Sequence, residues 1–121
     1  MPISQQLQDG LLTVVMTGTV SLDEFQRYQT QLVEERAVKS DVTFVDLSEV
    51  EEIQLGFAEL QSHAHWLTEV SPGRIKEVIF APSDLSYGVA RMYQALVNES
   101  FQVIVCRQLE DAQDQLKGFL G

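Results

Sequence analysis

The stretch Val42-Thr43-Phe44-Val45-Asp46-Leu47 is a short run of mostly apolar and β-branched residues, and it predicts a buried strand. A second run, Arg74 to Ala81, holds Val78-Ile79-Phe80 in succession, which is typical of a strand covered on both faces. Between the two runs, the segment from Leu55 to Val70 repeats its apolar residues at helical spacing. A strand, a helix and a strand in this order indicate two parallel strands joined by a right-handed helical crossover.

The same alternation extends towards both ends of the chain. Ser21 and Glu24 form the pattern of a capping box, so we expect a helix from about Leu22 to Val38. Ser71-Pro72-Gly73 stops the helix of residues 55–70. Pro82 ends the strand of residues 74–81. The later expected elements are a helix at about 87–98, a strand at 101–107 and a helix at 111–120.

The N-terminal end predicts a β-hairpin. Asp9-Gly10 is a two-residue turn signal between the weak strand candidate Ile3 to Gln8 and the β-branched run Leu11 to Val20. Together, the segments predict an α/β fold: a mixed, mostly parallel five-stranded sheet with four helices and an N-terminal β-hairpin. The helix of residues 55–70 should direct Phe57, Leu60, Ala64 and Leu67 to the core.

Length and charge restrict the function classes. With 121 residues and 45% apolar content, the chain fits one domain spanning residues 1–121. Its formal charge of −10 disfavours nucleic acid as a partner. We expect a cytoplasmic protein, because the start shows no secretory signal and no apolar run is long enough to span a membrane. Cys106 lies in an apolar run and is expected to be a core residue.

Three segments carry a family resemblance. They are Phe44 to Ser48, the third-helix motif Tyr87-Gly88-Val89-Ala90-Arg91-Met92-Tyr93, and Phe101 to Glu110. With these segments the chain resembles the SpoIIAA-like branch of the sulfate-transporter and anti-sigma-factor antagonist (STAS) domains, over nearly its whole length. The resemblance implies a mixed sheet covered by helices. It also implies a non-enzymatic role, since typical members bind proteins or small ligands.

One position departs from the family pattern. In the regulatory members, a serine at the start of the second helix is phosphorylated by a partner kinase. This chain has Leu55 and Gly56 there, and neither residue has a hydroxyl to carry a phosphate. Ser48 lies too early to replace it. We therefore expect no phosphorylation switch at this place.

Other catalytic or metal-binding patterns are weak. His63 and His65 are two residues apart, which on a helix points them about 200° from each other, so we interpret them as surface or flanking residues. Asp46, Glu49, Glu51 and Glu52 are interpreted as a solvated acidic loop rather than a hard-metal site. We expect neither an enzyme nor a bound cofactor or metal.

A candidate ligand site follows from the architecture. Open α/β sheets bind ligands beyond the carboxyl ends of their strands. The segment 82–88 is rich in usable polar groups there, although helix capping by Asp84 or Ser86, with Tyr87 covering the loop, would select the same residue types. The candidate ligand-binding residues are Pro82, Ser83, Asp84, Ser86 and Tyr87, with Asp46 and Ser48 opposite.

A candidate interface lies on the second helix. Trp66 projects about 130° from the centre of the expected core face, and Leu55 projects almost the same way. Tryptophan is enriched at binding hot spots, but Trp66 could equally fold under a neighbouring loop. The candidate interface residues, for a second copy of the chain or for another protein, are Leu55, Glu59, His63, Trp66 and Val70.

Three functions are compatible with these patterns. The first is a protein-interaction or regulatory module, which the resemblance favours. The second is a carrier or sensor of a small apolar or amphiphilic ligand bound at the carboxyl ends of the strands. The third, with least support, is an enzyme that uses the carboxylates of Asp46 and Asp84.

Overall fold

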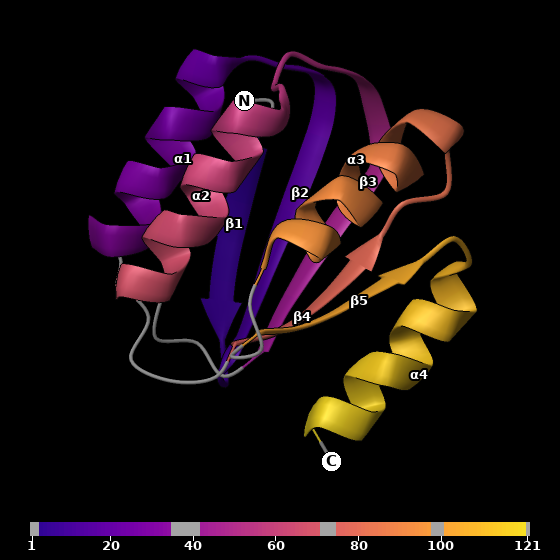
Figure 1. Cartoon of the computed structure of the whole chain (residues 1–121). Helices are drawn as coiled ribbons and strands as arrows, with labels where there is room; N and C mark the ends of the chain where they lie inside the picture. Colours follow the sequence, from indigo (N-terminus) through magenta and orange to yellow (C-terminus); the bar gives the residue numbers. More distant parts are fainter. Residues whose placement is uncertain (1–2, 35–41, 71–74, 98–100, 121) are drawn as a thin grey trace.

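The computed structural model describes residues 3–34, 42–70, 75–97 and 101–120. Strands and helices alternate along the chain after an initial pair of strands (Figure 1). In order, the elements are β1 (Ile3–Gln8), β2 (Leu11–Val20), α1 (Leu22–Glu34), β3 (Val42–Ile53), α2 (Phe57–Val70), β4 (Ile75–Phe80), α3 (Asp84–Leu96), β5 (Phe101–Cys106) and α4 (Leu109–Leu120).

The strands form one five-stranded sheet in the order β1-β2-β3-β4-β5. β1 is antiparallel to β2, and every later pair is parallel. The predicted α/β class, the mixed sheet and the four helices are therefore confirmed. The turn between β1 and β2 has positive φ at both Asp9 (52°) and Gly10 (82°), which is the conformation that the Asp-Gly signal predicts.

The two faces of the sheet carry separate apolar clusters. The larger cluster joins residues such as Val14, Val45 and Ile79 to α1, α2 and α3. The smaller cluster lies on the opposite face, where Val78 and Cys106 pack with residues of α4. Successive residues of a strand point to opposite faces, so the alternation along β4 and β5 serves both clusters. Cys106 is buried, as expected for a core residue.

β3 is longer than predicted. The strand continues from Leu47 to Ile53, so the segment that we interpreted as a solvated acidic loop is a strand and not a loop, although Glu49, Glu51 and Glu52 are exposed as expected. The continuation pairs with the second half of β2, with irregular register between Val15 and Thr17 and again after Gly18, whose φ is 62°. Val50 is buried while its acidic neighbours are exposed, so backbone pairing and a few apolar contacts hold this strongly charged strand.

Helix boundaries also differ from the predictions. α3 begins at Asp84 and α4 at Leu109, earlier than expected, while α1 is described as far as Glu34 and the rest of its predicted length lies outside the described residues. The stop signal Ser71-Pro72-Gly73 lies outside them too. Phe57 is 56% exposed and was wrongly assigned to the core, because it is the first residue of α2 and lies beyond the packed turns.

Candidate functional site

The main candidate site is a cavity of about 70 Å³ between the sheet and helices α1, α2 and α3. β2, β3 and β4 form its floor, and the three helices form its walls. Most of its surface is apolar, but four ionisable side chains also line it. The lining includes Tyr28, His63, Glu77 and Tyr93, together with Ile53 and Leu55.

Glu77 is the acidic residue of the cavity. It lies in β4 on the face covered by the helices and is only 6% exposed. The Tyr93 hydroxyl in α3 donates a hydrogen bond of 2.6 Å to Oε1 of Glu77. Burial raises the pKa of Glu77 to about 7, although the hydrogen bond from Tyr93 lowers it in part. A carboxyl in this environment changes its protonation state near neutral pH.

The same environment shifts the pKa values of the two tyrosines of the cavity, Tyr28 and Tyr93. Burial, followed by the nearby charge of Glu77, raises the pKa of both Tyr28 and Tyr93 above the ordinary value. Both hydroxyls therefore keep their protons at neutral pH and can act as hydrogen-bond donors.

His63 is the basic residue of the cavity, and it is neutral. Its side chain is 6% exposed, and burial lowers its pKa to about 4. The amide nitrogen of Gln29 lies 2.7 Å from Nδ1. An amide nitrogen can only donate, so Nδ1 accepts and the ring carries its proton on Nε2. The interpretation of His63 as a surface or flanking residue is wrong, because α2 turns it towards α1.

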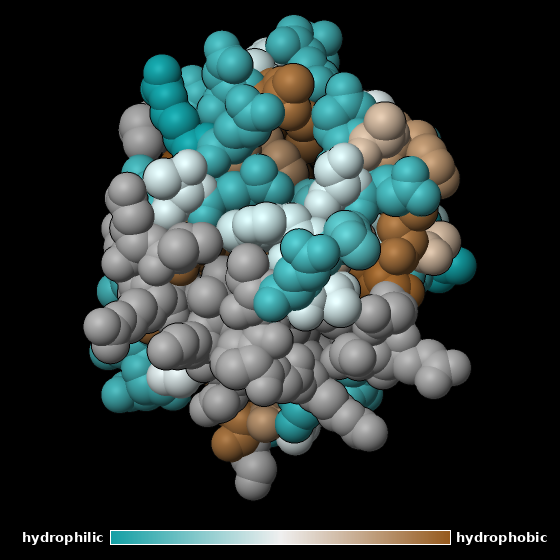
Figure 2. Space-filling view, turned by 60° about the vertical axis from the view of Figure 1, so that its left-hand side comes forward, coloured by the Kyte–Doolittle hydropathy of each residue, from teal (hydrophilic) through white to brown (hydrophobic). Residues whose placement is uncertain are grey.

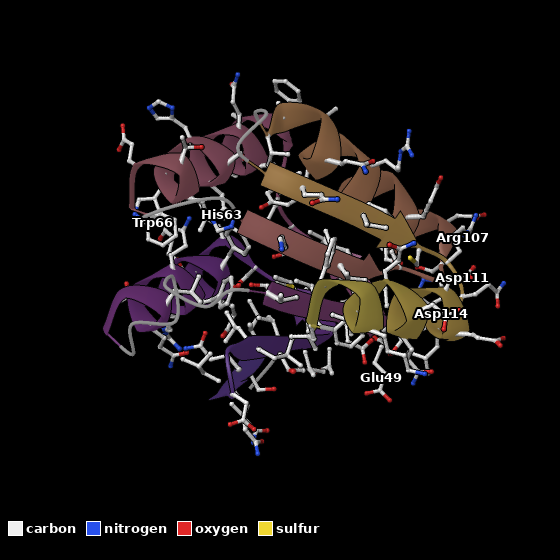
Figure 3. All side chains as sticks on the ribbon, turned by 90° about the horizontal axis from the view of Figure 1, so that it is seen from below. Glu49, His63, Trp66, Arg107, Asp111 and Asp114 are labelled. Carbon is white, nitrogen blue, oxygen red and sulfur yellow. The ribbon has the colours of Figure 1, made fainter. Side chains whose placement is uncertain are left out.

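Aromatic rings enclose the His63 imidazole. Phe25 meets it edge-on with ring centres 4.7 Å apart, and Trp66 stacks on it at 5.7 Å. Tyr93 and Tyr28 lie at 6.0 Å and 6.4 Å. Figure 3 shows His63 and Trp66 together between α2 and α1. The rings fix the imidazole in one orientation and keep it away from bulk water.

Three polar atoms of the cavity have no hydrogen-bond partner within the described part of the chain: the Tyr28 hydroxyl, Nε2 of His63 and Oε2 of Glu77. Their residues are buried. Buried polar atoms in native proteins are normally paired with protein or with water. The cavity therefore offers hydrogen bonds to a molecule inside it.

The polar and apolar parts of the cavity lie at different positions along the parallel strands. Glu77 is in register with Thr43, near the start of the parallel strands. Ile53 and Leu55 lie at the other end, where β3 leads into α2, and both are half-buried. Figure 2 shows apolar atoms among hydrophilic ones at the upper end of the molecule, where Figure 1 places the ends of β2 and β3. The cavity is thus polar at depth and apolar towards the strand ends.

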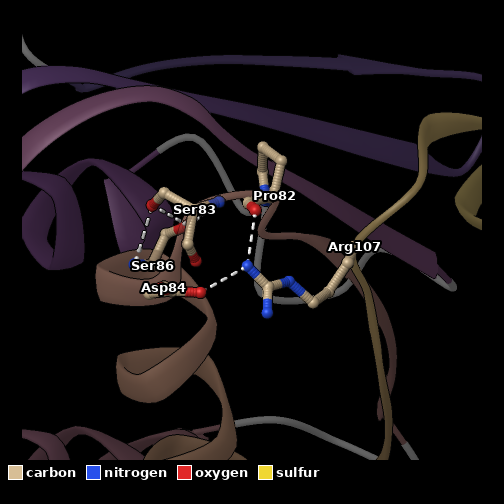
Figure 4. Close-up of polar contacts among 5 residues, drawn as sticks. All are labelled: Pro82, Ser83, Asp84, Ser86 and Arg107. Carbon is tan, nitrogen blue, oxygen red and sulfur yellow. Dashed lines mark hydrogen bonds and ion pairs between the residues drawn. The ribbon is translucent and has the colours of Figure 1, made fainter.

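The predicted ligand residues of segment 82–88 do not line this cavity. Ser83 caps α3: its hydroxyl accepts from the Ser86 backbone nitrogen at 3.0 Å, and the Ser86 hydroxyl accepts from the Ser83 backbone nitrogen. Arg107 donates to Asp84 at 2.7 Å and to the Pro82 carbonyl at 2.9 Å (Figure 4). Helix capping was expected from Asp84 or Ser86; Ser83 is the N-cap because α3 begins earlier.

The remaining members of that predicted site also lie apart from the cavity. Arg107 stacks over the Tyr87 ring at 4.9 Å. Asp46 accepts from the Ser48 backbone nitrogen at 2.9 Å and is in register with Phe80, so it points to the face that carries α4. The polar atoms of Asp84, Ser83 and Asp46 thus already have protein partners, and the prediction that these residues bind a ligand stays a prediction.

The predicted interface stripe is less exposed than expected. His63 is buried, and Leu55 and Trp66 are half-buried against the main core. Glu59 is used locally, because its Oε2 accepts from the Gly56 backbone nitrogen at 3.1 Å. Val70 lies at the end of α2. The prediction that these residues face solvent is wrong for His63, because the core face of α2 is centred between Leu60 and His63.

Sequence reasoning missed the acidic centre of the cavity. The available signal was Glu77, a carboxylate inside a strand that was predicted to be covered on both faces. Tyr28 and Tyr93 carry no comparable signal, because tyrosines at helical spacing are typical of a core.

Two further structural findings concern the part of the chain that the structure describes. It contains no group of three or more histidine, cysteine, aspartate or glutamate side chains placed to hold a metal ion. None of its helices is long and apolar enough to cross a membrane.

Sheet order, strand directions and helix placement together define a SpoIIAA-like fold, which solved structures bear out. One neighbour is an uncharacterized protein of the DUF3478 family with a SpoIIAA-like fold from Shewanella loihica PV-4 (TM-score 0.61, 15% identity, 94% of this chain and 91% of that chain covered). Another is the protein TM1081, solved by NMR (TM-score 0.60, 13% identity, 93% and 86% covered). No protein-family model and no curated protein matches the sequence.

Proposed function

We propose that this domain binds a small molecule in the cavity between the sheet and α1, α2 and α3, and acts as a carrier or sensor rather than as an enzyme. The observation that carries the proposal is that Tyr28, His63 and Glu77, three buried residues that line a mostly apolar cavity, each have a polar atom without a hydrogen-bond partner among the described residues. A pocket with an apolar lining and a few convergent polar groups is the usual form of a small-molecule site.

The cavity volume limits the ligand. An engineered cavity of about 150 Å³ in another protein holds benzene. A cavity of about 70 Å³ therefore suits a smaller molecule, or the head of a longer one whose tail leaves past Leu55. The polar part of the ligand would therefore lie near the start of the parallel strands, on the helix-covered face, and only its apolar part would reach the strand carboxyl ends at Ile53 and Leu55. This site differs from the 82–88 segment.

The test combines native mass spectrometry with a cavity-filling variant. Protein purified without denaturation should retain a small molecule, or should show NMR shift changes at cavity residues on addition of small ketones and alcohols. Ala90→Leu extends a side chain into the cavity and should abolish both signals. Ala95→Leu makes the same change on the exposed side of α3 and should leave them intact. Equal binding by Ala90→Leu, or no binding by the parent to any probe, would refute the proposal.

A protein-interaction role is the second candidate function. It is favoured by large apolar side chains that are exposed on neighbouring helices, namely Phe57 at the start of α2 and Leu85 and Met92 on α3. Leu85 and Met92 are seven residues apart, so they share one side of their helix. The matched test is capture of a partner or self-association by the parent and by Phe57→Ser; unchanged association in the variant would exclude this surface.

A further inference from the structure

The donor and acceptor pattern of the cavity specifies the chemistry of its ligand, and the argument rests on the proposed function. His63 presents Nε2–H, because Nδ1 is occupied by the Gln29 amide. Tyr28 presents a hydroxyl without a protein partner among the described residues. Oε1 of Glu77 accepts from Tyr93, which leaves Oε2 of this cavity-lining residue as the third polar atom.

The charges around Glu77 favour an uncharged ligand. Among the described residues, the titratable groups that face it are Tyr28 from α1, His63 from α2 and Tyr93 from α3, and the lining contains no lysine or arginine. Lys76, the preceding residue, lies on the other face of the sheet over the Phe119 ring. A buried anion would have no counter-charge here, and burying an unpaired charge is costly.

We propose that the cavity binds a compact, neutral molecule through one acceptor oxygen, which receives hydrogen bonds from Nε2 of His63 and the Tyr28 hydroxyl, and that binding requires the proton on Oε2 of Glu77. With its proton, Oε2 is a third donor to the same oxygen. Without it, the carboxylate repels the acceptor oxygen of the ligand and attracts the donors of Tyr28 and His63 to itself. Glu77 loses this proton near neutral pH, because burial raises its pKa to about 7.

The first experiment uses three probes of nearly the same shape: cyclobutanone, methylenecyclobutane and cyclobutylammonium. Affinities are measured by NMR titration of the parent protein at pH 6 and pH 8.5. The ketone should bind about tenfold more tightly than the alkene at pH 6, as expected for hydrogen bonding to an acceptor. Its affinity should fall by about 30-fold at pH 8.5, while that of the alkene should stay nearly constant. The ammonium probe should bind most weakly at pH 6.

Variants assign the effect to residues. Tyr28→Phe keeps the ring and should weaken the ketone but not the alkene. Tyr87→Phe, a tyrosine outside the cavity, is the control. Glu77→Gln keeps a donor in place of the protonated carboxyl, so ketone binding should persist and lose its pH dependence.

The outcomes separate this inference from the proposed function. Equal affinity for ketone and alkene at both pH values, with shift changes at the cavity, would overturn the ligand chemistry and leave the binding function standing. Tighter binding of the ammonium probe at pH 8.5 would overturn it in favour of a cation site. No binding of any probe in the cavity would remove both proposals.

Discussion

Tyr93 donates a hydrogen bond of 2.6 Å to Oε1 of Glu77, joining the last turns of α3 to the middle of β4 inside the protein. The contact gives the buried carboxyl one partner and leaves its second oxygen to the cavity. The proton of the Glu77 carboxyl therefore affects both the stability of the fold and the proposed site.

Glu77 should make the fold less stable as the pH rises. Between pH 4.5 and about 7, the folded protein keeps a proton that the unfolded chain releases, so rising pH favours unfolding. The free energy of unfolding of the parent should fall by roughly 3 kcal/mol relative to that of Glu77→Gln across this window. Chemical denaturation of both proteins at several pH values measures the difference. A constant difference would show that Glu77 is not buried as described.

His63 should act in the opposite direction. Its pKa is about 4 in the folded protein and 6.5 in the unfolded chain, so the unfolded chain takes up a proton first as the pH falls. Stability present above pH 6.5 is lost towards pH 4, by roughly 3 kcal/mol. His63→Asn, which keeps an acceptor for Gln29, should remove this acid dependence. His65→Asn on the exposed side of α2 is the control, and an equal effect of both would contradict the burial of His63.

Trp66→Ala should destabilise the domain by about 2 to 4 kcal/mol, because the ring stacks on His63 and packs against the main core. Phe57→Ala removes a side chain that is 56% exposed and should cost well under 1 kcal/mol. Thermal and urea denaturation give both values. If Trp66→Ala unfolds like the parent but loses self-association, the tryptophan belongs to an interface instead.

Ser83→Ala should cost about 1 kcal/mol, since it removes the N-cap of α3 and one half of the capping box with Ser86. Ser83→Asp should restore most of the loss, because aspartate is also a good N-cap. Ser62→Ala, on the exposed side of α2, should be close to neutral. Retained ligand in all three would show that Ser83 serves the helix and not the binding site, whereas ligand loss in Ser83→Ala alone would support a site at the 82–88 segment.

The start of α2 should carry no regulatory phosphate. Leu55 has no hydroxyl, and neither has Gly56, whose backbone N–H donates a hydrogen bond to Oε2 of Glu59 at the start of the helix. Phosphopeptide mapping of protein from its native cells should find no stoichiometric phosphate between Ser48 and Ser62. A phosphate at Ser48 would show that the switch has moved along the chain rather than disappeared.

Local patterns in the sequence were enough to predict the fold. The Asp9-Gly10 turn, the Ser21 cap, whose oxygen accepts from the Glu24 backbone nitrogen, and the apolar runs of β3 and β4 depend on neighbours in the chain, and each is found. The acidic half of β3 was missed, because pairing with β2 rather than intrinsic preference holds it in a strand.

The candidate site was decided by tertiary structure. Tyr28, His63, Glu77 and Tyr93 come from four elements, and no spacing along the chain shows that they meet at one cavity. Helical periodicity fixes the angles between side chains on α2, but not which side of the helix faces the sheet. The packing of α1 against α2 buries His63 and leaves Phe57 exposed. Burial, which shifts the protonation of His63 and Glu77, is a property of that packing and not of the residues themselves.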